Sequence, residues 1–512
     1  MSDLPYKLRT ALTRIAALVA CAMPGCMVGP KYHVPPALPQ SPPESYKESP
    51  SQYNEAGGWK VAQPQDAMLR GNWWEIFHDP ELNALEEQLN INNQNIKQYF
   101  QNYMEARALV GEAQSQLYPT VSVSPSYTWS RSPSLASSNS TNNSQGTSGN
   151  TSNFATVPFD ASWEPDLWGK IRNTINSAAY NSQMSAADLE NERLTEQSSL
   201  ATFFFEIRGQ DALEKLYHDT IVFDRQQVDY TRAQYDTGVG DQISVIEAQN
   251  TLLSAEAAAT NLGVARAQYE HAIAVLIGKS PSQFTIPVKP SVTAPPPIPI
   301  GVPSQLLERR PDVAAAERLM AAANAQIGIA DAAYYPDLTL SATAGFESNS
   351  ISTLFDWPNR FWSIGPSVSY TIFDAGLRQA TVNQYIATYN ADLAGYRQTV
   401  LTAFQQVEDN LAAVRIMSHQ IEQENQAVQS ATTYVHLELG RFQTGIDPYV
   451  DVVIAQTTLL NNQQTLLTLQ VQELASAVQL IAALGGGWQH SQLPTTREVS
   501  QWPTTQETAI QP

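Results

Sequence analysis

The sequence predicts a mixed fold in which short membrane-spanning β-strands are joined to very long α-helices, with the whole plan present twice in one chain. Two proline-free segments, 170–234 and 377–441, are long enough for helices of roughly 100 Å. Four segments alternate apolar with small polar side chains over about ten residues, as strands of membrane barrels do. Motifs also recur at a nearly constant spacing, which indicates an internal repeat.

The repeat is visible in matched motifs. Tyr118-Pro119 recurs 217 residues later as Tyr335-Pro336, whereas the spacing between Gly238 and Gly445 is 207. The first copy therefore carries ten extra residues between its first strand and its long helix. We predict a signal peptide at 1–25, an N-terminal lipoprotein segment at 26–72, a first repeat at 73–280, a proline-rich linker at 281–303, a second repeat at 304–487 and a C-terminal tail at 488–512.

The first 25 residues have the pattern of an export signal. Three basic residues precede the apolar run Ile15–Met23, which ends at Gly25-Cys26. The run is too short to span a bilayer, which needs about 20 residues, and no later segment has 18 consecutive apolar residues. Any membrane crossing by the mature chain therefore requires β-strands.

The first copy begins with a helix and then turns to strands. Apolar positions at helical spacing predict one helix over 81–117, which Pro119 ends. Because four strands cannot close a barrel, the membrane interpretation needs several chains, and an ordinary soluble hairpin is the alternative. Strands are predicted near 119–130, 156–166, 337–347 and 363–373, with exposed loops at 131–153 and 349–360.

Long helices follow Gly169 and Gly376. In the second copy, apolar residues at three- and four-residue spacings form a coiled-coil-like seam, and the opposite face is polar but weakly charged, which suits a water-filled lumen. A fibrous coiled coil is the alternative. The seam consists of Leu393, Tyr396, Val400, Phe404, Val407, Leu411 and Val414.

Composition excludes several classes of function. The formal net charge is −20, which argues against a nucleic-acid binder. Both cysteines lie in the first 26 residues, so the body of the chain has no disulfide or cysteine nucleophile. Acid pairs such as Glu86-Glu87 lie on helices without a companion nucleophile and are expected to be solvated. We therefore predict no catalytic residue, no bound metal and no cofactor.

Five motifs occur in a fixed order along nearly the whole mature chain. They are Cys26-Met-Val-Gly-Pro-Lys-Tyr32, Trp73-Trp74, Trp163-Glu-Pro-Asp-Leu-Trp-Gly169, Leu306-Leu-Glu-Arg-Arg-Pro-Asp312, and the paired turns at Gly238 and Gly445. In this order and spacing the chain resembles the TolC/OprM-type outer-membrane factor family, and specifically its NodT-like lipoprotein branch.

The resemblance implies a homotrimer in which each chain gives four strands to a twelve-stranded barrel, continued by a periplasmic α-barrel. It implies an outer-membrane exit duct that passes small toxic compounds or drugs from a proton-driven inner-membrane pump and a periplasmic adaptor to the outside. It also implies lipid on Cys26, which anchors the chain in the outer membrane; an unmodified thiol is the alternative. An elongated structural or adhesive outer-membrane lipoprotein is the alternative function.

The resemblance further implies a closed periplasmic mouth. The family places a constricting aspartate where the tip helix begins, which corresponds to Asp451. The position of a frequent second acid is Ile454 here, so an apolar ring of Val450 or Ile454 would back the acidic one. Its repeat partner Glu247 is acidic and would partly replace the missing charge. A helix N-terminal aspartate favoured by the macrodipole is the alternative. The tips expected to dock the adaptor are Gly238, Val239, Gly445 and Ile446.

Overall fold

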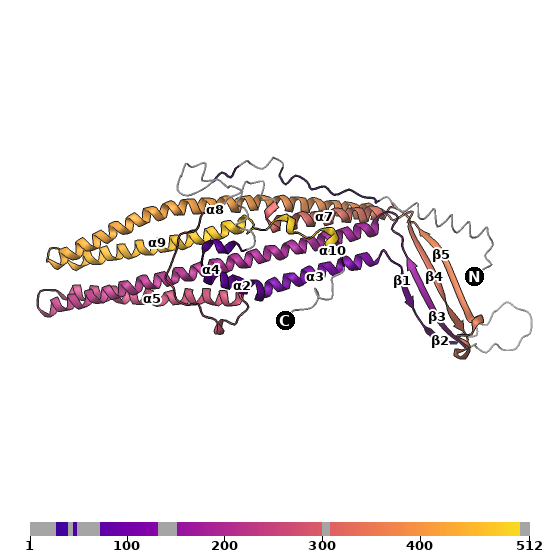
Figure 1. Cartoon of the computed structure of the whole chain (residues 1–512), viewed down its shortest axis with the longest axis horizontal. Helices are drawn as coiled ribbons and strands as arrows, with labels where there is room; N and C mark the ends of the chain where they lie inside the picture. Colours follow the sequence, from indigo (N-terminus) through magenta and orange to yellow (C-terminus); the bar gives the residue numbers. More distant parts are fainter. Residues whose placement is uncertain (1–26, 39–44, 49–71, 132–150, 299–307, 502–512) are drawn as a thin grey trace, which may run out of the picture.

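The computed structural model describes residues 27–38, 45–48, 72–131, 151–298 and 308–501. Within these residues the molecule is elongated, with a bundle of long helices at one end and a narrow sheet at the other (Figure 1). The predicted signal peptide and Cys26 lie outside the described residues.

The helices of the two copies match in length. The pairs are α3 (Gln94–Ser115) with α7 (Pro311–Ala332), 22 residues each; α4 (Lys170–Asp236) with α8 (Leu377–Gln443), 67 each; and α5 (Gln242–Leu276) with α9 (Tyr449–Ala483), 35 each. The two predicted long helices are thereby confirmed, and each runs two residues further than expected.

A glycine in the left-handed conformation precedes each of these long helices. Gly169 has φ 85° and Gly376 has φ 90°. An aspartate just before each glycine accepts a hydrogen bond from a free backbone N–H group of the first turn: Asp166 from Ile171 at 3.2 Å, and Asp374 from Arg378 at 3.3 Å. The chain can therefore turn sharply from strand to helix at both places.

The first helix is broken, which corrects the prediction of one helix over 81–117. The structure has α2 (Pro80–Asn92) and α3, separated by Asn93 with ψ 129°. The Asn93 side chain accepts from the backbone N–H of Ile96 at 3.0 Å and donates to the carbonyl of Leu276 at 2.9 Å. The apolar spacing continues through the break, so only the contact with α5 reveals it.

The sheet joins strands from both copies. Its strands are β1 (Thr120–Val123), β2 (Ser126–Arg131), β3 (Thr151–Trp163), β4 (Asp337–Ser348) and β5 (Arg360–Ser369). All pairings are antiparallel: β3 pairs with β1 and β2 on one side and with β4 on the other, and β5 pairs with β4. The hairpins of the two repeats therefore form one continuous surface.

Three of the predicted strands differ from the structure by more than one residue, and the one expected at 363–373 is β5, which spans Arg360–Ser369. The strand expected at 119–130 is interrupted at Ser124-Pro125, where proline has no N–H to donate to β3. The return strand begins at Thr151, five residues before the expected start at 156. Its first residues are polar, so the alternation of side chains did not mark them as strand.

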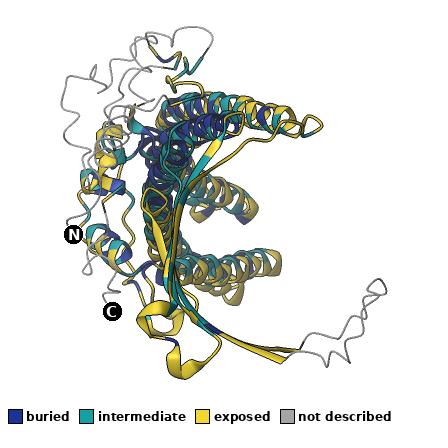
Figure 2. Cartoon of the chain, turned by 90° about the vertical axis from the view of Figure 1, so that its right-hand side faces the viewer, coloured by how far each residue is buried: buried dark blue, intermediate teal, exposed yellow. Residues whose placement is uncertain are grey.

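The sheet is exposed on most of its surface and curves away from the helices (Figure 2). Within the chain, β1 and β2 form one edge and β5 the other. Trp129 and Trp362 are each 74% exposed, and Ile364 is 76% exposed. In the described part of the chain, the sheet therefore has open edges and large apolar side chains that nothing covers.

The core lies in the helical bundle. The predicted seam of α8 is confirmed at its centre, where Val400, Val407 and Leu411 are buried. Among the described helices, α9 alone is long and apolar enough to cross a membrane, but half of its most apolar window is buried inside the chain. Since α9 packs along α8 and α4, it is a core helix.

Glu86 corrects another expectation. It is 0% exposed, and within the described residues neither of its carboxylate oxygens has a hydrogen-bond partner. Helical spacing puts it beside Leu82 and Leu89, on the face of α2 that packs on α4, whereas Glu87 points to solvent as expected. Burial raises the pKa of Glu86 well above its ordinary value, because the charged form is disfavoured in this apolar surrounding.

Candidate functional site

The two helical hairpins end in matched glycine turns, at the end of the molecule farthest from the sheet (Figure 1). Gly238 has φ 75° and Gly445 has φ 76°, and a Cβ at either would meet no atom within 4 Å. Glycine is therefore needed for its conformation and not for space. The prediction that these residues end one long helix and lead into another is confirmed.

The residue after each glycine is apolar and projects into solvent. Val239 is 79% exposed and Ile446 is 65% exposed. Ile243 lies one turn further on and is 70% exposed. Apolar side chains this exposed at the ends of the hairpins contribute nothing to the core, so they are available for contact with another molecule.

The two tip helices begin differently. Asp241 caps α5 and accepts from the backbone N–H of Ser244 at 2.7 Å. In the second copy Pro448 occupies the equivalent position and has no capping side chain. The preceding Asp447 forms a two-bonded pair with the guanidinium of Arg441, which closes the turn instead.

Asp451 belongs to an acidic cluster that sequence analysis missed. The carboxylate oxygens of Glu438, Asp447 and Asp451 lie within 4.8 Å of one another. Burial and the charge of Asp447 raise the pKa of Glu438, while the hydrogen bond from Arg441 lowers the pKa of Asp447. Glu438 lies thirteen residues before Asp451, and the turn between them brings the two together.

The other predicted gate residues lie outside this cluster. Val450 and Ile454 are on the exposed face of α9, at 40% and 52% exposure. Glu247 is half-buried on α5, in the other hairpin, where its charge acts on Tyr449 and contributes to raising the pKa of that phenol. One chain therefore places the acids on both hairpins.

The N-terminal segment is held where sheet and helices meet. The backbone N–H of Val28 donates to the carbonyl of Trp168 at 3.0 Å, and Asn173 Nδ2 donates to the carbonyl of Val28 at 3.2 Å. A Cβ at Gly169 would come within 2.8 Å of the Met27 side chain. The residue that follows Cys26 is thereby fixed beside the start of α4.

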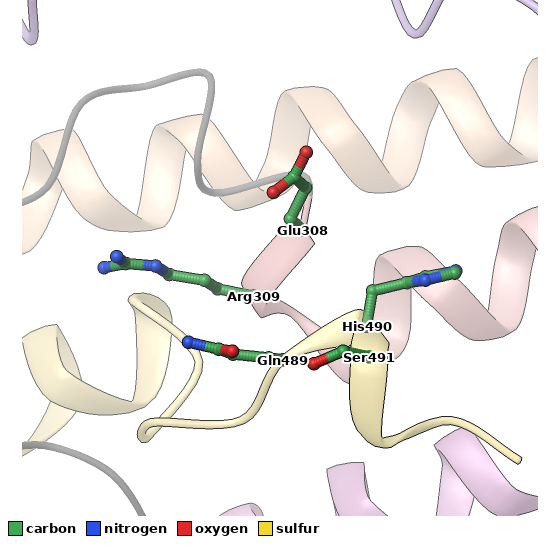
Figure 3. A pocket seen from close by; sticks show the side chains of 5 residues that line it. All are labelled: Glu308, Arg309, Gln489, His490 and Ser491. Carbon is green, nitrogen blue, oxygen red and sulfur yellow. The ribbon is translucent and has the colours of Figure 1, made fainter. Parts of the chain in front are cut away.

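A cavity of about 460 Å³ lies between the start of α7 and the C-terminal segment. Its side chains do not converge: Arg309 and Gln489 point to one side, and His490 points to the other (Figure 3). Without a common focus, these residues do not form a catalytic arrangement.

Comparisons with known proteins agree with this architecture. A family model described as "Outer membrane efflux protein" matches residues 85–279 and 302–486. The chain is 29% identical over 476 residues to "Probable efflux pump outer membrane protein TtgC" of Pseudomonas putida, covering 92% of this chain and 95% of the relative. It is 27% identical to "Cation efflux system protein CusC" of Escherichia coli, covering 92% and 98%.

Among solved structures, the outer-membrane channel OprN superposes with a TM-score of 0.79 at 26% identity, covering 90% of this chain and all of that one. These relatives are outer-membrane channels of efflux systems and not enzymes. The chain belongs to the outer membrane efflux protein family.

Proposed function

We propose that three copies of this chain form a homotrimer in which a twelve-stranded barrel continues into a helical duct. The observation that carries the proposal is the open sheet: the described strands fill four positions, with β1 and β2 in one line, and no other described strand pairs with either edge. Pairing β5 of one copy with the β1–β2 edge of the next would satisfy those backbone groups, as lipid requires.

Native mass spectrometry and planar-bilayer recordings of the purified full chain test this assembly. We expect a trimer that conducts ions. A monomeric, non-conducting rod would contradict the proposal and favour the adhesive or structural lipoprotein.

We further propose that the chain works with a periplasmic adaptor and an inner-membrane pump, which is supported by the similarity to a relative named as an efflux pump outer membrane protein. We propose that the pump here is proton-driven and that the cargo is small toxic compounds or drugs. The exposed apolar tips at Val239 and Ile446 support docking of the adaptor at the ends of the two hairpins.

Cys26 is proposed as the lipid-bearing residue. The contacts of Met27 and Val28 at Gly169 support this, because they hold the chain next to Cys26 at the junction of strands and helices. That junction would lie at the periplasmic surface of the outer membrane, where acyl chains attached to the protein can insert.

Labelled palmitate is expected to enter the wild-type protein and to be lost in Cys26→Ser. The barrel still holds the variant in the membrane, so we expect partial export activity. Incorporation that survives in Cys26→Ser would rule out this residue as the anchor.

Asp451 is proposed to form an acidic ring at the closed mouth. Its nearness to Glu438 and Asp447 supports a concentration of negative charge there, which would attract cations. In Asp451→Ala we expect a higher conductance or a lower cation preference in planar bilayers. A helix-start role for Asp451 predicts lower stability with unchanged selectivity, and unaltered conductance, selectivity and cation block in a folded trimer would contradict the gate.

A further inference from the structure

The two helical hairpins meet along α4 and α9, which pack against each other. Two contacts define the register: a Cβ at Gly209 would come within 2.5 Å of Val471, and Gln464 Nε2 donates to Tyr217 Oη at 2.6 Å. The two helices are therefore antiparallel, and residue numbers fall along α9 as they rise along α4. Continuing this register two helical turns beyond Tyr217 places Asp224 opposite Gln456.

At the level of Asp224, the side chains buried between α4 and α9 are polar, and several of their polar atoms lack hydrogen-bond partners among the described residues. Asp224 is 2% exposed and Gln227 is 7% exposed, on the same face of α4. In the described part of the chain no hydrogen-bond partner is present for Asp224 Oδ2, Gln227 Oε1, or either side-chain polar atom of Gln456. Buried polar groups without partners weaken a contact, so the hairpins are held less firmly here than along the apolar stretches.

The surroundings of Asp224 favour its neutral form. The charge of Asp224 reaches Tyr449 on α9, and the charge of Glu247 on α5 acts on the same phenol, while the side chains of Gln456 and Gln227 are uncharged. The adjacent Arg225 instead pairs with Glu256 at 2.7 Å, and its side chain is 63% exposed. Burial raises the pKa of Asp224 to about 6.

We propose that Asp224 is a proton-dependent latch between the α4–α5 hairpin and the α8–α9 hairpin. With a neutral carboxyl the two hairpins stay packed. An ionised carboxylate in the same dry, unpartnered position favours separation, which hydrates it. The inference rests on the proposed function only where it assigns the hairpin tips to the mouth of a channel. The packing of the two hairpins can be measured whether or not the protein conducts ions.

The direction of the pH dependence follows from the raised pKa. The packed state holds the proton more tightly than the separated state, where Asp224 returns toward its ordinary value near 4. The latch therefore contributes its full stability at low pH and loses it as the pH rises through about 6.

A fluorine label on one hairpin tip tests the latch. Val239→Cys in a Cys21→Ser/Cys26→Ser background carries a trifluoromethyl tag at a single site, because these two cysteines are the only ones in the sequence. By ¹⁹F NMR of the full-length protein we expect two populations whose ratio changes at least fivefold between pH 5 and pH 7, with a midpoint near 6. Asp224→Asn should remain in the low-pH population throughout.

Two variants make the assignment specific. Asp219→Asn removes an exposed carboxylate of the same helix and should retain the wild-type profile. Gln456→Lys places an ammonium opposite Asp224 and should move the midpoint to lower pH. Asp224→Asn leaves His218 and His436 in place, so a pH-dependent ratio that persists in this variant would overturn the proposal, as would a wild-type ratio that does not change with pH.

Discussion

Replacing both Val239 and Ile446 with glutamate is expected to abolish export while leaving the trimer folded. The two side chains are 79% and 65% exposed and touch no core, so the change costs the fold little. At a docked tip, however, each new carboxylate would have to lose its water without gaining a partner, which costs several kcal/mol. The cellular accumulation of an exported dye measures the loss, and co-purification with the adaptor locates it.

Replacing the same two residues, Val239 and Ile446, with lysine distinguishes a need for apolar side chains from an effect of negative charge. Loss with both glutamate and lysine would show that the adaptor needs apolar tips, whereas loss with glutamate alone would reflect repulsion by nearby acids such as Asp447. Val288→Glu, at a 61% exposed site remote from the tips, should export normally. Normal export by both double variants would count against docking at these turns.

Asp211→Ala is expected to have the largest effect on stability. The Asp211 side chain is 0% exposed and accepts from Arg266 Nε at 2.7 Å and from the backbone N–H of Lys289 at 2.8 Å. It also pairs with Arg208, whose side chain is 3% exposed, at 3.3 Å. This one carboxylate therefore joins α4, α5 and the proline-rich linker.

Removing the carboxylate would leave Arg208 with Glu81, and Arg266 with Glu270, as their remaining acidic partners among the described residues. The charge in the interior would then be only partly compensated, and the backbone N–H of Lys289 would lose its acceptor. We expect a loss of about 3–5 kcal/mol in the free energy of unfolding, since breaking a buried pair costs that much. Asp219→Ala is the matched control: its pair with Lys215 is 2.8 Å long but about 60% exposed on both sides, and exposed pairs are worth about 0–1 kcal/mol. Urea unfolding followed by helical circular dichroism measures both, and equal midpoints for the two variants would contradict the expectation.

Local rules determined much of this protein. The proline-free stretches after Gly169 and Gly376 predict the long helices, because helical hydrogen bonds and periodic apolar positions are properties of neighbouring residues. The sequence also predicts the turns at Gly238 and Gly445, because a turn between two helices needs a residue that adopts positive φ, and this is again a local property. Motif order was enough to identify the family, which the comparisons confirm.

Contacts between distant residues decided the rest. The break at Asn93 depends on the carbonyl of Leu276, and the burial of Glu86 depends on α4 covering one face of α2. The grouping of Glu438 with Asp451 likewise requires the hairpin to be folded. A helical pattern shows which residues share a face but not what packs against it. Burial, pairing and protonation, which follow from what packs there, were therefore settled only by the tertiary structure.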